Sequence, residues 1–370
     1  MKTIIKYFII FIVFIVAFVA TLYITSLIPS SWLQKNVQES SEVLLKESNR
    51  KKVYIKTKKM TFQFDNFTDA LMINTAYSID STTPLYSAFT AKKNYIPGKT
   101  KTIVQDSVSE LKSASKYNGY HNEVGELYDV AHNDIEESFE YARYWHGYLI
   151  FLRPLLTVFN VTTIRIILIT IFVALGMWLL YLLYKKLSPF IAMFFFVGLV
   201  GVEYLYIGIS LQGASIFLIL MIASIYILIR HEKIKSIGIT FFIIGMLTNF
   251  FDFLTVPILT YGMPLIIYFL LQQKNQRLSF KESTIIFIKT GISWILGYAG
   301  TWLAKWILMD LIYDRNLLEI ALRTSKISLS RSRKKIFIWA NTKNESCILF
   351  IAINIKYSNR IFSKYCTKKD

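Results

Sequence analysis

The sequence YARYWHGYLIFLRPLLTVFN, residues 141–160, decides the fold, because a long polar segment ends here and a nearly continuous apolar region begins. Its aromatic side chains are of the amphipathic kind that gathers at the level of lipid headgroups. Arg143, His146 and Arg153 fall at the same depth, where lipid phosphates lie. Arg153-Pro154 interrupts the apolar run, since proline lacks an N–H and clashes with the preceding turn. The stretch predicts an interfacial helix leading into a membrane span, either as a plain aromatic belt with snorkelling arginines or as part of a substrate site.

The composition indicates an all-α polytopic membrane protein. Over 370 residues, 54% are apolar, and the formal net charge is +18. The positive charge does not indicate a basic surface for nucleic acid, because residues 29–147 carry 15 basic and 15 acidic side chains. The excess lies in the C-terminal tail and in short loops between apolar segments, where Lys and Arg set membrane topology. We therefore expect no nucleic-acid partner.

The N-terminal segment, residues 1–28, predicts a retained transmembrane anchor. Positions 7–28 carry no charge, which is longer than the apolar part of a signal peptide, and no small-residue cleavage site follows. Lys2 and Lys6 precede this run and predict a cytoplasmic N-terminus in the plasma membrane. The next segment, residues 29–147, then lies outside the cell, and its length predicts a helical extracellular loop domain.

The region of residues 148–313 predicts a transmembrane helix bundle with the interfacial helix at its start. Loops assigned to the inside are basic, whereas the two short outer turns contain no Lys or Arg. With the anchor, the pattern predicts about seven spans, at residues 7–28, 163–184, 190–210, 211–229, 237–251, 254–271 and 284–312.

The tail, residues 314–370, differs in character from the rest of the chain. It is rich in Lys, Ser, Asn and Ile, and its apolar residues show no clear period. It can be a disordered or membrane-surface tail, or the product of out-of-frame translation that replaces further spans and leaves this copy inactive. Cys347 and Cys366 both lie here, so thiolate ligands for zinc are absent from the first 346 residues.

Polar side chains within spans are costly and therefore mark candidate functional sites. Those toward the outer ends include Arg153, Arg165, Asp252 and Lys305. Ion pairing inside the bundle, such as Lys305 with Asp310, is the simpler explanation for any one of them. Together they predict a polar cavity open to the outside, where cations can hold a phosphate.

A second candidate is FDNFTDALMINTAYSID, residues 64–80. Asp65 and Asp69 are four residues apart, so a helix presents both carboxylates on one face. Such a pair can supply a general base or hold a divalent cation. Alternatively, Asn66 with Asp69 three residues later forms an N-cap box that opens a helix. No metal site is predicted from the histidines, and a divalent cation remains possible.

The layout resembles the membrane-embedded glycosyltransferases of the GT-C fold, which use polyprenyl-phosphate sugars. The segments YWHGYLIFLRPLL and NFFDFLTVPILTYGMPL also look like membrane proteins of low-GC Gram-positive bacteria. The resemblance implies sugar transfer from a polyprenyl-phosphate donor to a cell-envelope acceptor on the outer face, with membrane lipid as the other partner. It implies that Asp69 or Asp65 is the base and that the phosphate ligands are Arg143, His146 or Arg153. From the outer polar cavity we also expect Arg165 to stabilise the phosphate and Asp252 and Lys305 to bind substrate.

Two other functions are compatible with the same sequence. A transporter or flippase for a lipid-linked or anionic solute would use these polar residues to line a path, but it predicts polar residues through the whole bilayer. Their clustering toward one face favours the enzyme. A non-catalytic envelope protein is the third possibility.

Overall fold

The computed structural model describes residues 2–49, 65–95, 123–133, 135, 137–252, 255–275 and 278–313. The predicted tail, residues 314–370, lies outside these residues. Within them the chain is almost entirely helical, as the composition predicts. A short antiparallel pair, β1 (Lys93–Asn94) with β2 (Ser138–Phe139), adds a small sheet.

Among the residues that the structure describes, four helices are long and apolar enough to cross a membrane. They are α1 (Lys2–Ser26), α8 (Val161–Lys186), α11 (Leu211–Arg230), which with the following turn η2 (His231–Lys233) makes one candidate span, and α14 (Phe280–Tyr313). Each coincides with a predicted span, because a helix satisfies every backbone hydrogen bond inside one apolar segment. This part of the prediction is confirmed: the protein is helical and has membrane-spanning character.

The other three predicted spans are helices, but each is shorter than a typical span of about 20 residues. They are α9 (Pro189–Gly201), α12 (Ile237–Phe251) and α13 (Leu259–Asn275). The predicted span at residues 190–210 breaks after Gly201, where Glu203 adopts a left-handed backbone with φ of 53° and a single turn, α10 (Tyr204–Ile207), follows. The low helix propensity of glycine favours a helix end at Gly201.

Side-chain caps fix where several of these helices begin. The Asn160 Oδ1 accepts a hydrogen bond from the Thr163 N–H at the start of α8, at 3.2 Å. Ser188 caps α9 and Ser210 caps α11 through their Oγ atoms in the same way. These residues satisfy backbone N–H groups that no helical carbonyl can reach.

The bundle is organised by α11, most of whose residues are buried, and by a close contact between α12 and α14. A Cβ added at Gly245 would lie 2.2 Å from the Trp294 carbonyl oxygen, and one added at Gly297 would lie 2.1 Å from that of Phe242. Small residues at facing positions let two helix backbones approach closely, which is the usual basis of helix packing in membranes.

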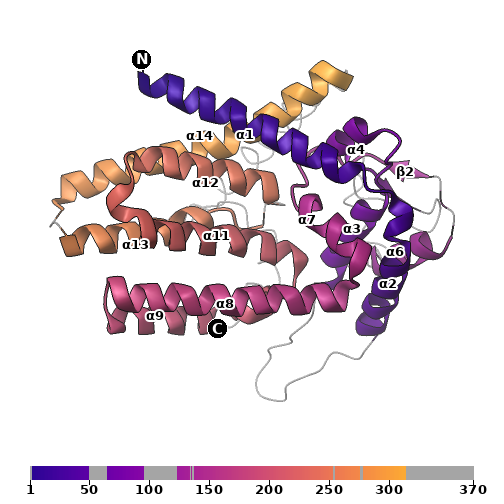
Figure 1. Ribbon diagram of the computed structural model, residues 1–370, viewed down its shortest axis with the longest axis horizontal. Coiled ribbons are helices and arrows are strands. Elements are labelled where there is room, and N and C mark those ends of the chain that lie inside the picture. The colour runs from indigo at the N-terminus through magenta and orange to yellow at the C-terminus, as the bar shows by residue number, and fades with distance from the viewer. Residues whose placement is uncertain are drawn as a thin grey trace, which may run out of the picture. The chain divides into compact units, whose positions relative to one another are not determined.

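The described residues between 29 and 140 form what we call the cap, which includes α2 (Gln34–Asn49), α3 (Asn66–Tyr77), α4 (Pro84–Thr90), α6 (Glu123–His132) and the β1–β2 pair. A short turn, η1 (Ser30–Trp32), links α1 to α2. Figure 1 shows the cap helices gathered at one end of the long helices. Helix α6 packs against both α2 and α3.

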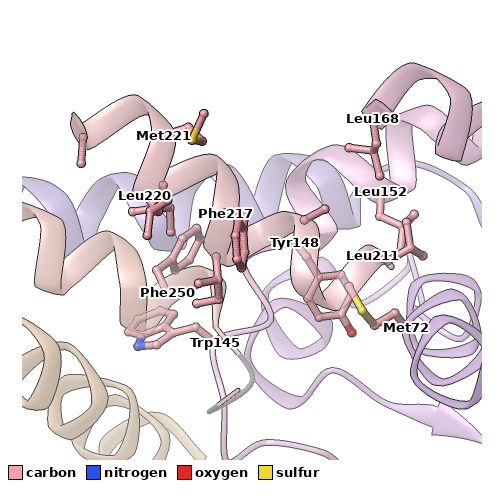
Figure 2. Close-up of a cluster of buried hydrophobic side chains, with 14 of the residues drawn as sticks. Met72, Trp145, Tyr148, Leu152, Leu168, Leu211, Phe217, Leu220, Met221 and Phe250 are labelled. Atoms are coloured by element: carbon pink, nitrogen blue, oxygen red, sulfur yellow. The ribbon is translucent and has the colours of Figure 1, made fainter. Parts of the chain in front are cut away.

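An apolar core runs from the bundle into the cap. Trp145 packs beside Phe250, with ring centroids 5.9 Å apart, and Tyr148 lies beside Met72 (Figure 2). Trp145 is 1% exposed and Tyr148 is fully buried. Both rings are therefore core residues that the cap covers, rather than an exposed aromatic belt.

The interfacial segment is helix α7 (Leu149–Val158), which contains Pro154. Pro154 lies inside α7, so the expected interruption at Arg153-Pro154 does not end the helix. Proline removes one backbone hydrogen bond, but Leu149, Leu152 and Leu156 are buried on both sides of it. Their burial holds the short helix together across the missing bond.

Candidate functional site

Arg165, near the start of α8, is the centre of a buried charged network. Its Nη2 donates to the Asp69 Oδ2 at 2.8 Å, and its Nη1 lies 3.0 Å from a Glu47 carboxylate oxygen. Nη2 also donates to Asn66 Oδ1 at 3.1 Å. Two carboxylates from the cap thus neutralise one guanidinium from the bundle, and hydrogen bonds satisfy the buried charges as burial requires.

Asp69 has a second role in this network. Its Oδ1 accepts the Leu211 N–H at 2.9 Å, so the same side chain holds the first turn of α11. Burial raises the pKa of Asp69 to about 6, although Arg165 and the Leu211 N–H act to lower it. With both carboxylate oxygens engaged, Asp69 joins α3, α8 and α11.

Asp65 is the residue that opens α3. Its Oδ1 accepts the Thr68 N–H at 3.2 Å. The cap therefore lies one residue earlier than the Asn66 cap considered from the sequence; Asn66 is instead the first helical residue and turns its side chain to Arg165. Asp65 is exposed and Asp69 is fully buried, so the two carboxylates occupy different environments despite their helical spacing.

Arg153 is fully buried and donates hydrogen bonds to backbone carbonyls of other segments. Its Nε donates to the Thr25 carbonyl at 3.1 Å, and its Nη atoms donate to the carbonyls of Ala76 and Ile28. Burial lowers the pKa of Arg153 to about 10, so the group stays charged at neutral pH. The guanidinium thus ties the C-terminal ends of α1 and α3 to α7, by donating hydrogen bonds to their carbonyl groups.

His146 and Lys305 lie buried under the cap. The Nε2 of His146 is 2.7 Å from the Tyr141 carbonyl, and its Nδ1 is 3.3 Å from the Tyr148 hydroxyl. A neutral ring satisfies both contacts, with Nε2 donating and Nδ1 accepting. Burial lowers the pKa of His146 to about 3, so the ring carries no charge with which to hold a phosphate at neutral pH.

Lys305 reaches from α14 to the end of α4. Its Nζ donates to the Phe89 carbonyl at 2.6 Å. It also lies 4.8 Å from the Phe89 ring centroid and 5.2 Å from that of Trp145, and the faces of these rings attract a cation.

The remaining candidates meet at the boundary between cap and bundle, in a set that we call the junction cluster: Arg143, Tyr144, Asn249, Asp252, Tyr298 and Trp302. The Tyr144 and Trp302 rings stack with centroids 6.3 Å apart. Trp302 Nε1 donates to the Arg143 carbonyl at 3.2 Å, which fixes the backbone while the Arg143 side chain stays exposed. Its guanidinium carbon lies 5.8 Å from the Tyr144 ring centroid.

Asp252 supplies the carboxylate of the junction cluster. It is 5% exposed, and its Oδ1 accepts the Thr255 N–H at 3.0 Å, which shapes the turn after α12. Burial raises the pKa of Tyr144, while Arg143 acts to lower it and Asp252 to raise it. Both charges therefore act on the Tyr144 hydroxyl. Tyr298 lies beside Asn249 and Asp252 on the same side.

The structure thus sorts the residues expected from the sequence into separate sets. Arg143 and Asp252 both act on the Tyr144 hydroxyl, and His146 and Lys305 are buried under the cap. Arg165 and Asp69 form their own network, and Arg153 is bound to carbonyl groups. In the described ranges, no group of three or more His, Cys, Asp or Glu side chains could hold a metal ion.

The sequence reasoning missed two features. Tyr144 was treated as an ordinary interfacial aromatic and Trp302 was not singled out, although their stacked rings belong to the junction cluster. Lys93 is fully buried with Glu123 and with Glu126, whose Oε2 lies 3.2 Å away. Burial raises the pKa of Glu126, while Lys93 acts to lower it. The charge signal was present in the sequence, but the partners lie about 30 residues apart and across a segment outside the described ranges.

Fold and site together define a membrane-embedded helical protein with a helical cap at one end of its bundle. Comparisons with known protein families, with curated proteins and with solved structures found no match to this chain.

Proposed function

We propose that this protein is a GT-C-like membrane glycosyltransferase that moves a sugar from a polyprenyl-phosphate donor to a cell-envelope acceptor. In this proposal the shorter helices α9, α12 and α13 complete seven spans in the plasma membrane. The N-terminus is cytoplasmic, the cap faces outside, and transfer takes place at the outer face.

The junction cluster is the observation that carries the proposal. It combines an exposed guanidinium, stacked aromatic rings and a buried carboxylate at the boundary between an apolar bundle and a polar cap. A guanidinium suits a phosphate because it offers paired donors. Aromatic faces such as those of Tyr144 and Trp302 suit an isoprenoid chain or the apolar side of a sugar ring.

The proposed step is a substitution at the anomeric carbon of the donor sugar. A carboxylate takes the proton of the acceptor hydroxyl, the hydroxyl oxygen bonds to the anomeric carbon, and the bond to the phosphate oxygen breaks. The polyprenyl phosphate leaves with the bonding electrons, and Arg143 offsets the charge that develops on it.

We assign the base to Asp252 in this proposal. The resemblance to GT-C enzymes implies Asp69 or Asp65 instead. Both oxygens of Asp69 already hold Arg165 and the Leu211 N–H, and Asp65 caps α3. Asp252 is buried, and its charge and that of Arg143 both act on the Tyr144 hydroxyl, which supports this choice.

The experiment uses the full chain reconstituted in lipid vesicles with a radiolabelled sugar on polyprenyl phosphate. We expect R143Q to weaken donor binding about 10- to 100-fold, the worth of a hydrogen bond to a charged group. D252N should retain donor binding and lose turnover, because the amide keeps the shape and loses the base. Arg230→Gln, an exposed arginine on α11 outside the cluster, is the matched control and should behave as wild type.

Other results identify the alternatives. Turnover lost in D69N or D65N but kept in D252N would move the base to the residue implied by the resemblance. Uptake of the labelled compound into the vesicle lumen without covalent transfer would show a transporter. No binding of the donor by wild type would contradict the proposed function altogether.

One structural observation weighs against the transporter. Between α12, α13 and α14, Thr248 and Thr260 share a 2.7 Å hydrogen bond, and Trp294 Nε1 donates to the Thr260 hydroxyl at 3.2 Å. These buried groups satisfy each other, which suits a packed interface better than a hydrated path.

A further inference from the structure

A basic hollow lies at the end of the bundle away from the cap. Arg165 holds the cap near the start of α8, and Lys186 ends the same helix about 30 Å further along at 1.5 Å per residue. The hollow has a volume of about 230 Å³ and lies among the ends of α8, α11, η2 and α13. It is separate from the junction cluster.

The charge around the hollow is strongly one-sided. Lys185, Lys186, Lys233 and Lys274 line it, and Glu232 is the single carboxylate among its lining residues. Lys274 Nζ donates to the Lys186 carbonyl at 2.6 Å, so one lysine also closes the C-terminal end of α8. The Lys185 ammonium lies 3.5 Å from the Tyr181 hydroxyl, and Lys186 and Lys233 complete the basic lining of a space large enough for a phosphate.

One polar atom in the wall is left without a partner. The Nε2 of His231 is buried and has no hydrogen-bond partner among the described residues. A buried polar atom without a partner is costly, and a ligand oxygen in the hollow can satisfy it.

Part of the lining of the hollow is apolar. Leu228 and Leu271 line the hollow and are buried, whereas Ile229 lines it and is exposed. Ile222, Tyr226 and Ile229 are all exposed, and their spacing places them on one face of α11. An exposed apolar stripe therefore leads along the helix to the cationic hollow.

We propose that this hollow binds the phosphate-bearing headgroup of an anionic phospholipid, whose acyl chains lie along the α11 stripe. A free phosphate would use the lysines alone, but the stripe ending at Ile229 fits an amphiphile. Basic pockets between transmembrane helices are suited to such headgroups. The proposal requires only that the chain is embedded in a membrane and does not depend on the glycosyltransferase assignment.

The test measures thermal unfolding of the purified full chain in detergent while short-chain phosphatidylglycerol is added. We expect a saturable rise of the unfolding midpoint. Phosphatidylcholine with the same chains should have little effect, and inorganic phosphate should act only at much higher concentration. The K186Q/K233Q variant should need about 25-fold more phosphatidylglycerol, because a lysine near an anionic surface contributes about a factor of five.

The matched control is K235Q/K281Q, which removes two exposed lysines that do not line the hollow. It should respond as wild type does. Equal losses in the two double variants would show diffuse attraction and overturn the site. Inorganic phosphate as effective as phosphatidylglycerol would show a small-anion site and overturn the lipid assignment.

Discussion

Arg165 on α8 and Asp69 on α3 form a buried salt bridge, with 2.8 Å between Nη2 and Oδ2. The two residues are 96 positions apart. One belongs to a helix of membrane-crossing length and the other to the cap. Asp69 also holds the Leu211 N–H, so this pair fixes the cap onto two helices of the bundle.

Replacing Asp69 by Ala should destabilise the protein by about 3–5 kcal/mol, the usual cost of leaving a buried charge without its partner. The measurement is the free energy of unfolding by denaturant in detergent micelles. D69A/R165M should cost less than the sum of the single variants, since the two share one interaction. D65A, which removes only an exposed helix cap, should cost about 1 kcal/mol. Equal effects of D69A and D65A would contradict the role of Asp69 in fixing the cap to the bundle.

Replacing Gly297 or Gly245 by Ala should destabilise the α12–α14 contact. The added Cβ would lie within about 2.2 Å of a backbone oxygen of the facing helix, so the helices must separate. We expect a loss of at least about 1–3 kcal/mol, the range for overpacking. Gly262→Ala is the control, because no atom lies within 4 Å of its Cβ position. It should be neutral or stabilising by up to about 1 kcal/mol, as alanine favours a helix. Tolerance of G297A would contradict the close packing.

His146 should make the fold sensitive to acid. Its pKa is about 3 in the folded protein, while an unfolded histidine titrates near its usual value of 6.5. Between these values the unfolded state binds more protons, so stability falls as the pH falls. From pH 7 to pH 4.5 this residue should cost about 2–3 kcal/mol.

The check compares the unfolding free energy of wild type and H146Q across that pH range. Glutamine cannot titrate, so H146Q should have the flatter profile, and any contribution from Asp69 should be common to both. The contacts facing the imidazole are the Tyr141 carbonyl, the Tyr148 hydroxyl and the charge of Lys305. Parallel profiles would show that the ring is accessible to protons in the folded state.

The proposed topology predicts opposite labelling at the two ends of the bundle. Thr82 in the cap and Lys233 beside the basic hollow are both exposed. With Cys347 and Cys366 replaced by Ser, T82C should react with an impermeant thiol reagent in whole cells, and K233C should react only after the cells are opened. The reverse pattern would place the cap inside and exclude the proposed outer-face transfer.

The helices could be predicted from the sequence because their signal is local. The uncharged run from Tyr7 to Ile28 and the apolar runs within α8, α11 and α14 are visible as contiguous segments, and any such segment must satisfy its own backbone in a membrane. The α12 bounds also agree with the predicted segment, Ile237 to Phe251. The break after Gly201 was missed because hydropathy alone does not register the backbone bend at Glu203.

The roles of the polar residues depended on tertiary structure. The sequence marked Arg143, Arg153, Arg165 and Asp252 as costly polar groups near the outer ends of spans, but it could not show which groups they meet. In the sequence these three residues are simply arginines. In the structure Arg153 donates to three carbonyls, Arg165 binds two carboxylates, and Arg143 is exposed beside an aromatic ring. Only the tertiary structure decides between them. Electrostatic and hydrogen-bond partners act over a few ångströms, and here they come from residues 77 to 159 positions away.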